Sequence, residues 1–195
     1  MGQPQKLGSF LMHGAGEPMV DDGSDIESVE IVPLALGHIE SFHHALDVVS
    51  RERKYLSFLE APPLDQARRF VMDRIARGDP GYVAAVRGEV VGWCDITRHD
   101  RPIHAHRGAL GMGIVPSYRG RGLGRKLINA TVAQARKDGF VRIELFVHAD
   151  NARAIALYDK VGFVREGVQS DAICIDGQYG DTIMMAIVER KNAAG

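Results

Sequence analysis

Glycine and arginine alternate between Arg119 and Gly124, in the segment RGRGLG, and this turn has the residue types needed to bind an anion. Glycine lacks a Cβ and adopts left-handed conformations, so the backbone N–H groups of such a turn can come close to a ligand. A helix is expected to start here, and a helix N-terminus carries roughly half a positive charge. The turn and the start of that helix also contain four cations: Arg119, Arg121, Arg125 and Lys126. The pattern predicts a phosphate-binding turn.

Regular elements are expected on both sides of this turn. Apolar residues and glycines alternate from Leu110 to Ile114 as in a half-buried strand, which Pro116 ends. The segment 122–137 places its apolar residues on one helical face, and Gly139 stops that helix. A second strand is predicted over 141–147, followed by a short helix. The order is therefore strand, turn, helix, strand, helix.

Two common phosphate motifs do not describe the turn. A P-loop requires Gly-Lys followed by Ser or Thr, whereas Gly124 is followed by Arg-Lys-Leu. The dinucleotide fingerprint requires G-x-G-x-x-G, and the glycines here are spaced G-x-G-x-G.

Two motifs in this region resemble those of the GNAT superfamily of N-acetyltransferases. Arg119, Gly122 and Gly124 match the Arg/Gln-x-x-Gly-x-Gly/Ala signature of that superfamily. Downstream, its N-x-x-A-x-x-L-Y-x-x-x-G-F pattern is matched by Asn151, Ala154, Leu157, Tyr158, Gly162 and Phe163. The two motifs occur in the expected order with a strand between them, and a looser resemblance extends from about residue 26 to 189.

The resemblance implies that acetyl-CoA is the cosubstrate and that no metal is required. The pantetheine arm would pair with the strand before the turn and with Asn151, and the pyrophosphate would lie over the N–H groups of the turn. The implied cofactor-binding residues are Met112, Ile114, Val115, Arg119, Gly120, Arg121, Gly122, Leu123, Gly124, Arg125 and Asn151. The segment 53–63 would line the acceptor side.

Tyr158 matches the usual general acid of the family. A phenol with a pKa near ~10 stays protonated at neutral pH and can donate to a departing thiolate. The base is less defined, because Gly111 and Gly113 stand where many family members have a strand glutamate. His106 is the candidate carried forward, with His104, Asp95 or no dedicated base as alternatives. Three other polar residues are less favoured as the base: Glu144 is interpreted as a solvated or paired strand-face residue, and His148 and Asp150 as polar loop groups.

The remaining chain predicts an α+β domain with a mixed, mostly antiparallel twisted sheet flanked by helices. Residues 1–25 read as an irregular N-terminal segment and 26–190 as the N-acetyltransferase domain. Strands are expected over 28–33, 81–86, 90–97, 164–174 and 181–188, and helices over 36–53 and 65–77. The last two strands would form a hairpin around Asp176-Gly177.

Composition restricts the function further. The 195 residues carry a formal net charge of −1, which gives no general electrostatic reason to bind nucleic acid or a membrane. No apolar run reaches the ~18 residues of a membrane span, and the N-terminus does not resemble a signal peptide, so a cytoplasmic protein is expected. Cys94 and Cys174 lack a zinc spacing and are expected in or near the core.

The sequence therefore predicts an N-acetyltransferase that passes acetyl from acetyl-CoA to a primary amine by direct attack in a ternary complex. The closing pattern from Arg165-Glu166-Gly167 to Asp176-Gly177 resembles bacterial members acting on free amino acids or similar small amines. The alternatives are a protein N-terminal or lysine acetyltransferase and a non-catalytic acyl-CoA-binding sensor. Homodimers are frequent in this superfamily, so pairing is one expected arrangement.

Overall fold

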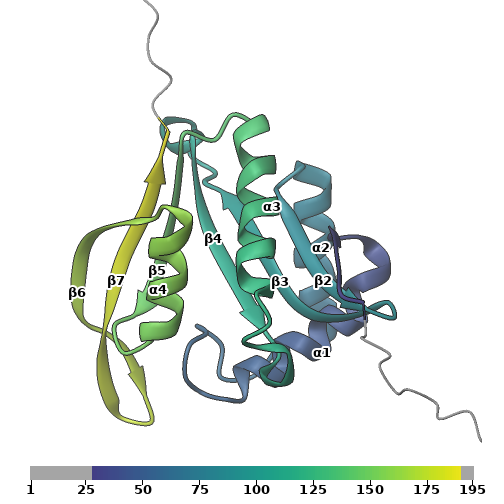
Figure 1. Ribbon diagram of the computed structural model, residues 1–195, viewed down its shortest axis with the longest axis horizontal. Coiled ribbons are helices and arrows are strands. Elements are labelled where there is room, and N and C mark those ends of the chain that lie inside the picture. Colours follow the sequence, from purple (N-terminus) through teal and green to yellow (C-terminus); the bar gives the residue numbers. More distant parts are fainter. Residues whose placement is uncertain (1–27, 190–195) are drawn as a thin grey trace, which may run out of the picture.

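The computed structural model describes residues 28–189, so the irregular segment expected over 1–25 lies outside the described residues. The elements run in the order shown in Figure 1. The strands are β1 (Glu30–Pro33), β2 (Gly81–Val86), β3 (Glu89–Arg98), β4 (Arg107–Ile114), β5 (Arg142–His148), β6 (Val164–Ile175) and β7 (Gln178–Val188). The α-helices are α1 (Ile39–Ser50), α2 (Leu64–Arg77), α3 (Leu123–Lys137) and α4 (Ala152–Val161). Short 3-10 turns are η1 (Leu36–His38), η2 (Pro102–His104) and η3 (Pro116–Tyr118).

The strands form one sheet of seven strands in the order β1-β2-β3-β4-β5-β7-β6. Neighbours are antiparallel except for β4 and β5, which are parallel. The parallel pairing covers only the start of both strands, from Arg107↔Arg142 to Ala109↔Glu144. Beyond Ala109 the two strands diverge, as Figure 1 shows, and the rest of β4 pairs with β3 alone. One edge of residues 110–114 is therefore left unpaired inside the sheet.

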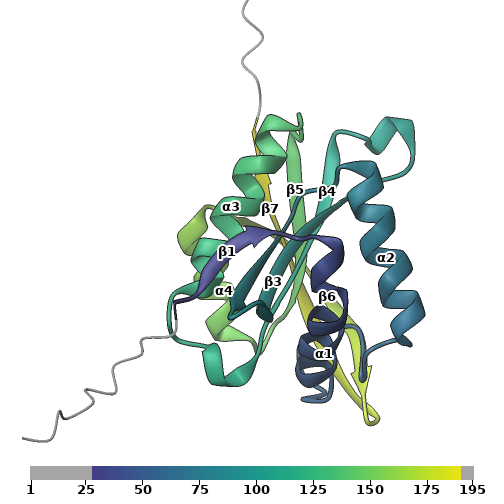
Figure 2. The same cartoon turned by 90° about the vertical axis from the view of Figure 1, so that its right-hand side faces the viewer.

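Helices cover both faces of the sheet (Figure 2). α3 and α4 lie on one face and bury the larger core, and α1 and α2 lie on the other face against β2 and β3. The apolar stripe of α3 packs inward as its spacing predicts, with buried residues including Leu123, Leu127, Ile128, Val132 and Ala135. The sheet is thus the middle layer between two pairs of helices.

The expected α+β architecture is confirmed, and the differences are local. The helix expected over 36–53 is a 3-10 turn followed by α1, which ends at Ser50. β4 begins at Arg107 rather than residue 110, because backbone pairing with β3 and β5 continues through a stretch whose side chains are polar or small. Cys94 is buried as expected, but Cys174 is exposed, because β6 is an edge strand with almost all of its residues on the surface. The hairpin around Asp176-Gly177 is confirmed: both residues have positive φ, 51° and 78°.

Gly113 has a packing role that its sequence context does not reveal. It is paired with Trp93 of β3, and a Cβ at this position would lie 2.2 Å from the indole ring. The ring therefore lies directly against the backbone of β4. The same ring contacts Phe42 of α1 edge-on, with the ring centroids 5.5 Å apart. Absence of a side chain at residue 113 is what lets the tryptophan join α1 to the sheet.

We expect Gly113→Ala to lower the free energy of unfolding by ~1–3 kcal/mol, because Trp93 must move out of a close-packed site. Urea titration followed by fluorescence checks this directly, since Trp93 is the single tryptophan of the chain. Gly167→Ala is the matched control: it also lies in a strand, but a Cβ there meets nothing within 4 Å. Equal effects of the two substitutions would contradict the packing role.

Candidate functional site

The glycine-rich turn exposes a run of backbone amides at the start of α3. Gly120 and Gly122 have φ of 84° and 76°, the left-handed region in which glycine is favoured. The first amide of this region to donate to a backbone carbonyl of the described chain is that of Lys126, which donates to Gly122 O at 3.3 Å. The amides of residues 120–125 have no backbone acceptor within residues 28–189. These free amides lie at the N-terminus of α3, where the sequence analysis predicts a phosphate-binding turn.

The unpaired edge of β4 leads into this turn. The amide of Val115 donates to Val91 O of β3 at 2.9 Å, so it points away from the gap between β4 and β5. Because backbone groups alternate along a strand, the polar groups of Met112 and Ile114 point into that gap. The carbonyl of Ile114 already accepts a hydrogen bond from Arg119 Nε at 2.8 Å. Met112 and Ile114 are thus placed to meet an extended ligand, whereas the amide of Val115 is bonded to β3 and its side chain packs against the core beside α1.

The cations near the turn have different environments. Arg119 forms a two-pronged ion pair with Glu52, just after α1, with one N···O distance of 2.8 Å, so it links the turn to the α1–α2 loop. Arg121 lies over the Tyr118 ring at 4.9 Å and donates to Ser117 O. Arg125 is exposed at the start of α3. The sequence analysis missed Arg153 of α4, whose guanidinium is 3.5 Å from the position of a Cβ on Gly120.

Gly124 has a steric role rather than a conformational one. A Cβ at this position would lie 2.7 Å from a methyl group of Leu157 in α4. Leu123 beside it is buried in the core, and the missing side chain of Gly124 brings α3 and α4 together. The two sequence motifs are therefore in contact through Gly124 and Leu157.

Tyr158 lies in the core beneath this contact. It is 8% exposed, and its ring meets Phe163 edge-on with the centroids 5.7 Å apart. Burial raises the pKa of the phenol above its usual value, and the nearby Cys94 adds to the rise. The hydroxyl makes no hydrogen bond to another residue in the described range. A neutral, unpartnered phenol of this kind can donate a proton to a ligand.

Asn151 caps helix α4. Its side-chain oxygen accepts a hydrogen bond from Ala154 N at 3.1 Å, which satisfies one of the free amides of the first turn. This contact occupies the oxygen and leaves the side-chain NH₂ as the group available to a ligand.

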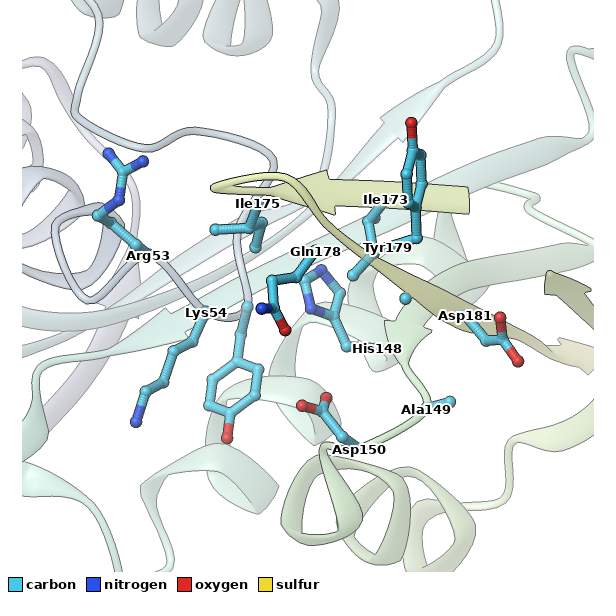
Figure 3. A pocket seen from close by; sticks show the side chains of 12 residues that line it. Arg53, Lys54, His148, Ala149, Asp150, Ile173, Ile175, Gln178, Tyr179 and Asp181 are labelled. Carbon is cyan, nitrogen blue, oxygen red and sulfur yellow. The ribbon is translucent and has the colours of Figure 1, made fainter. Parts of the chain in front are cut away.

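A cleft of about 630 Å³ lies between the α1–α2 loop and the β6–β7 hairpin. Its walls carry charges of both signs, and in Figure 3 Lys54 and Asp150 come from opposite sides of it. Arg53 pairs with Asp176 at the tip of the hairpin and so connects the two walls. The complete lining is Arg53, Lys54, Tyr55, His148, Ala149, Asp150, Ile173, Ile175, Gln178, Tyr179, Gly180 and Asp181.

His148 and Asp150 belong to this cleft, although the sequence analysis read them only as loop groups. The His148 ring is 6.0 Å from that of Tyr55, edge to face. Burial lowers the pKa of His148 below its usual value, although the Asp150 carboxylate opposes the shift. A signal was present in the sequence: both residues follow the C-terminal end of a strand and immediately precede the Asn151 motif.

The candidate bases lie at different depths. His106 is exposed, and its carbonyl accepts hydrogen bonds from Val141 N and Arg142 N where β4 and β5 come together. His104 is in the 3-10 turn before β4, and its ring lies 6.2 Å from that of His99. Asp95 of β3 is mostly buried and pairs with Arg74 of α2 at 3.0 Å. None of the three lines the cleft: His104 and His106 precede β4 at the end where β4 and β5 are still paired, and Asp95 lies beside Gly111, beyond the point where the strands separate.

Glu144 is paired, as the sequence suggested, but it is also buried. It accepts hydrogen bonds from Arg107 at 2.6 Å and Arg142 at 2.6 Å, and His99 contacts it at 3.1 Å. Burial raises the pKa of Glu144, but the two arginines outweigh this effect and hold it below its usual value. This carboxylate therefore holds the strands together where β4 and β5 begin.

Two further searches concern residues 28–189 only. No helix in this part of the chain is long and apolar enough to cross a membrane. No group of three or more His, Cys, Asp or Glu side chains in it is arranged to hold a metal ion.

Comparison with known families gives a match to the acetyltransferase (GNAT) family over residues 46–163. The chain is 34% identical over 110 residues to the L-amino acid N-acetyltransferase AaaT of Escherichia coli, covering 55% of this chain and 67% of that protein. It is 39% identical over 89 residues to the N-alpha-acetyltransferase RimI of Mycobacterium tuberculosis, covering 45% of this chain and 54% of that protein. Mycothiol acetyltransferases also match but are longer: the chain spans 28% of the one from Paenarthrobacter aurescens.

Solved structures share the fold. The protein yncA from Salmonella typhimurium, whose structure includes its cofactor acetyl-CoA, superimposes with a TM-score of 0.79 at 18% identity. The superposition covers 85% of this chain and 96% of that chain. At this identity the likeness establishes the architecture alone.

We expect Gly122→Val to weaken binding of coenzyme A at least about tenfold, because a β-branched residue at positive φ displaces the exposed amides. Isothermal titration calorimetry measures the dissociation constant. Gly139→Val is the matched control, since Gly139 follows the same helix at its other end, has φ of 80° and also has open space around it. If both variants bind coenzyme A as the native protein does, the turn is not the phosphate site.

Proposed function

Because the chain belongs to the acetyltransferase (GNAT) family, and with it to the acetyl-CoA-dependent N-acetyltransferases, we propose that its acceptor is the primary amine of a small molecule such as a free amino acid. The acetyl group would pass directly from the donor to the amine within a ternary complex. The observation that carries the proposal is the cleft of mixed charge beside the diverging strands.

The residues around the divergence fit coenzyme A. The unpaired edge of β4 offers the backbone groups of Met112, and the start of α3 offers free amides between two glycines with positive φ. Arg125 and Arg153 supply positive charge near phosphate groups. When bound, acetyl-CoA supplies a thioester carbonyl that is open to attack by an amine.

The cleft suits a small zwitterion. Lys54 on the loop side can attract a carboxylate, and Asp150 on the opposite side can attract an ammonium group. A volume of about 630 Å³ is within the ~300–1,000 Å³ of small-molecule sites. Similarity to AaaT, an L-amino acid N-acetyltransferase, supports the same class.

Tyr158 is the proposed proton donor to the departing sulfur. Its raised pKa keeps the phenol protonated throughout the neutral range, and no other described residue occupies its hydroxyl. Packing against Phe163 fixes the orientation of the Tyr158 ring in the core. Less conformational entropy is therefore lost when the phenol is oriented for proton transfer.

A protein N-terminus is the second candidate acceptor, favoured by the similarity to RimI of M. tuberculosis. A third possibility is a sensor that binds acyl-CoA without catalysis, which the missing strand glutamate favours. Thiol release from acetyl-CoA separates all three when the amines include free amino acids, simple amines and short peptides.

We expect free amino acids to give the highest kcat/KM in this panel, because the cleft offers partners for both of their charges. The corresponding amino-acid amides are the control, since they keep the amine and lose the carboxylate. Preference for peptides would favour the RimI-like function. Coenzyme A binding without amine-dependent thiol release would favour the sensor.

We expect Tyr158→Phe to lower kcat by about 10²-fold or more, because the leaving thiolate loses its proton donor. The dissociation constant for acetyl-CoA should stay within about threefold, since the ring remains packed in the core. Steady-state kinetics and calorimetry on the same preparation measure both quantities. Native-like turnover would exclude Tyr158 as the acid.

A further inference from the structure

On the face of the sheet that carries α1 and α2, the missing side chain of Gly111 leaves an opening in β4, which we call the Gly111 window. This residue is exposed and is paired with Asp95 of the neighbouring strand β3. A Cβ on Gly111 would lie 3.6 Å and 3.8 Å from the two carboxylate oxygens of Asp95. Gly113, which lies on the same face of β4, is covered by the Trp93 ring. Because Gly111 has no side chain, the Asp95 carboxylate of β3 is left uncovered on the β4 side, toward the gap between β4 and β5.

One carboxylate oxygen of Asp95 is ion-paired with Arg74, and the other is free to accept a proton. Oδ2 pairs with Arg74 Nη1 at 3.0 Å, and Arg74 is itself fixed by Thr97 and by the carbonyl of Pro80. Oδ1 makes no hydrogen bond to any residue of the described range, and it is not among the oxygens sealed from solvent. The available oxygen is the one nearer to Gly111.

The electrostatic setting of Asp95 makes it a usable base. Burial raises the pKa of Asp95 to about 6, Arg74 opposes the rise, and the buried Asp79 adds to it. Asp79 in turn contacts Arg77 at 3.4 Å. A carboxylate that titrates near pH 6 is ionised at neutral pH and still has appreciable affinity for a proton.

We propose that Asp95 is the general base of acetyl transfer and removes the proton of the acceptor ammonium across Gly111, directly or through one water. The proposal rests on the proposed function. β4 has glycines where many family members have a glutamate, so the role of base is assigned to Asp95 of the neighbouring strand β3. Glu144, a buried carboxylate of β5, already receives hydrogen bonds from two arginines.

The proton balance is complete. Asp95 takes one proton from the ammonium, and the neutral nitrogen forms the new C–N bond as the C–S bond breaks. Tyr158 donates its proton to sulfur, and the second proton lost by the nitrogen restores the phenol through solvent. The proton on Asp95 passes to water, so amide, free thiol and one proton are the net products.

The principal experiment is the pH dependence of kcat/KM for the native protein, Asp95→Asn and Asp79→Asn, with the best acceptor of the panel. We expect the native rate to fall as the pH drops below about 6, because the carboxylate becomes protonated. In Asp95→Asn, kcat/KM at pH 7 should be about 10²-fold lower or more, and the fall in rate below about pH 6, the acidic limb of the profile, should disappear. Asp79→Asn should keep the limb but move it to lower pH, since a charge that raises the pKa of Asp95 is gone.

A readout independent of turnover is the carboxyl ¹³C NMR titration of aspartate-labelled protein. The resonance that disappears in Asp95→Asn should titrate near pH 6 in the native protein and at lower pH in Asp79→Asn. An acidic limb that persists unchanged in an active Asp95→Asn variant overturns the proposal. Absence of acetyl transfer by the native protein to every amine would instead overturn the proposed function, with the NMR titration unaffected.

Asp95→Asn removes the ion-pair partner of buried Arg74 and could unfold the protein, so Gly111→Ala provides a second test. The added methyl fits at ordinary contact distance and leaves the Asp95–Arg74 pair intact, but it narrows the window. We expect at least about tenfold lower kcat with an unchanged dissociation constant for coenzyme A. Native kcat in Gly111→Ala would contradict access through this window.

Discussion

The early end of the pairing between β4 and β5 is the constraint on which the site depends. Parallel pairing stops at Ala109, and from there β4 has a free edge within a seven-stranded sheet. Unpaired backbone groups inside a sheet are unfavourable unless solvent or a ligand satisfies them. The divergence therefore prepares a place for an extended ligand, and the same strand leads directly to the free amides of α3. An acyl-CoA offers both an extended amide-containing arm and a pyrophosphate.

Two ion pairs fasten the α1–α2 loop to the parts of the chain that surround this gap. Glu52 holds Arg119 beside the glycine turn, and Arg53 holds Asp176 on the β6–β7 hairpin. Consecutive residues of one loop thus contact the donor side and the acceptor side. Exposed pairs contribute little to stability, but the two-pronged geometry at Arg119 specifies position. The motif arginine accordingly has its side chain engaged with the protein, and positive charge for phosphate is left to neighbours such as Arg125 and Arg153.

The two faces of the sheet, one carrying α3 and α4 and the other α1 and α2, have different chemistry. The α3–α4 face buries the phenol of Tyr158 among apolar side chains, where it stays neutral. The α1–α2 face contains the Asp95–Arg74 pair beside exposed Gly111. A proton donor and a proton acceptor are thus assigned to opposite faces of one diverging strand. Burial raises the pKa of both groups, so the phenol stays protonated at neutral pH while the pKa of Asp95 rises to about 6.

Local features of the chain were predictable from sequence. The left-handed glycines of the turn, the apolar stripe of α3 and the Asp176-Gly177 hairpin each depend on residues close together along the chain. The family, fold class and donor followed from two such local motifs. The assembly of the cleft, the Glu52–Arg119 pair and the position of Asp95 beside Gly111 required the tertiary structure. These contacts join residues far apart in sequence, and the order and register of the strands, which arise from packing of the whole sheet, decide which of them meet.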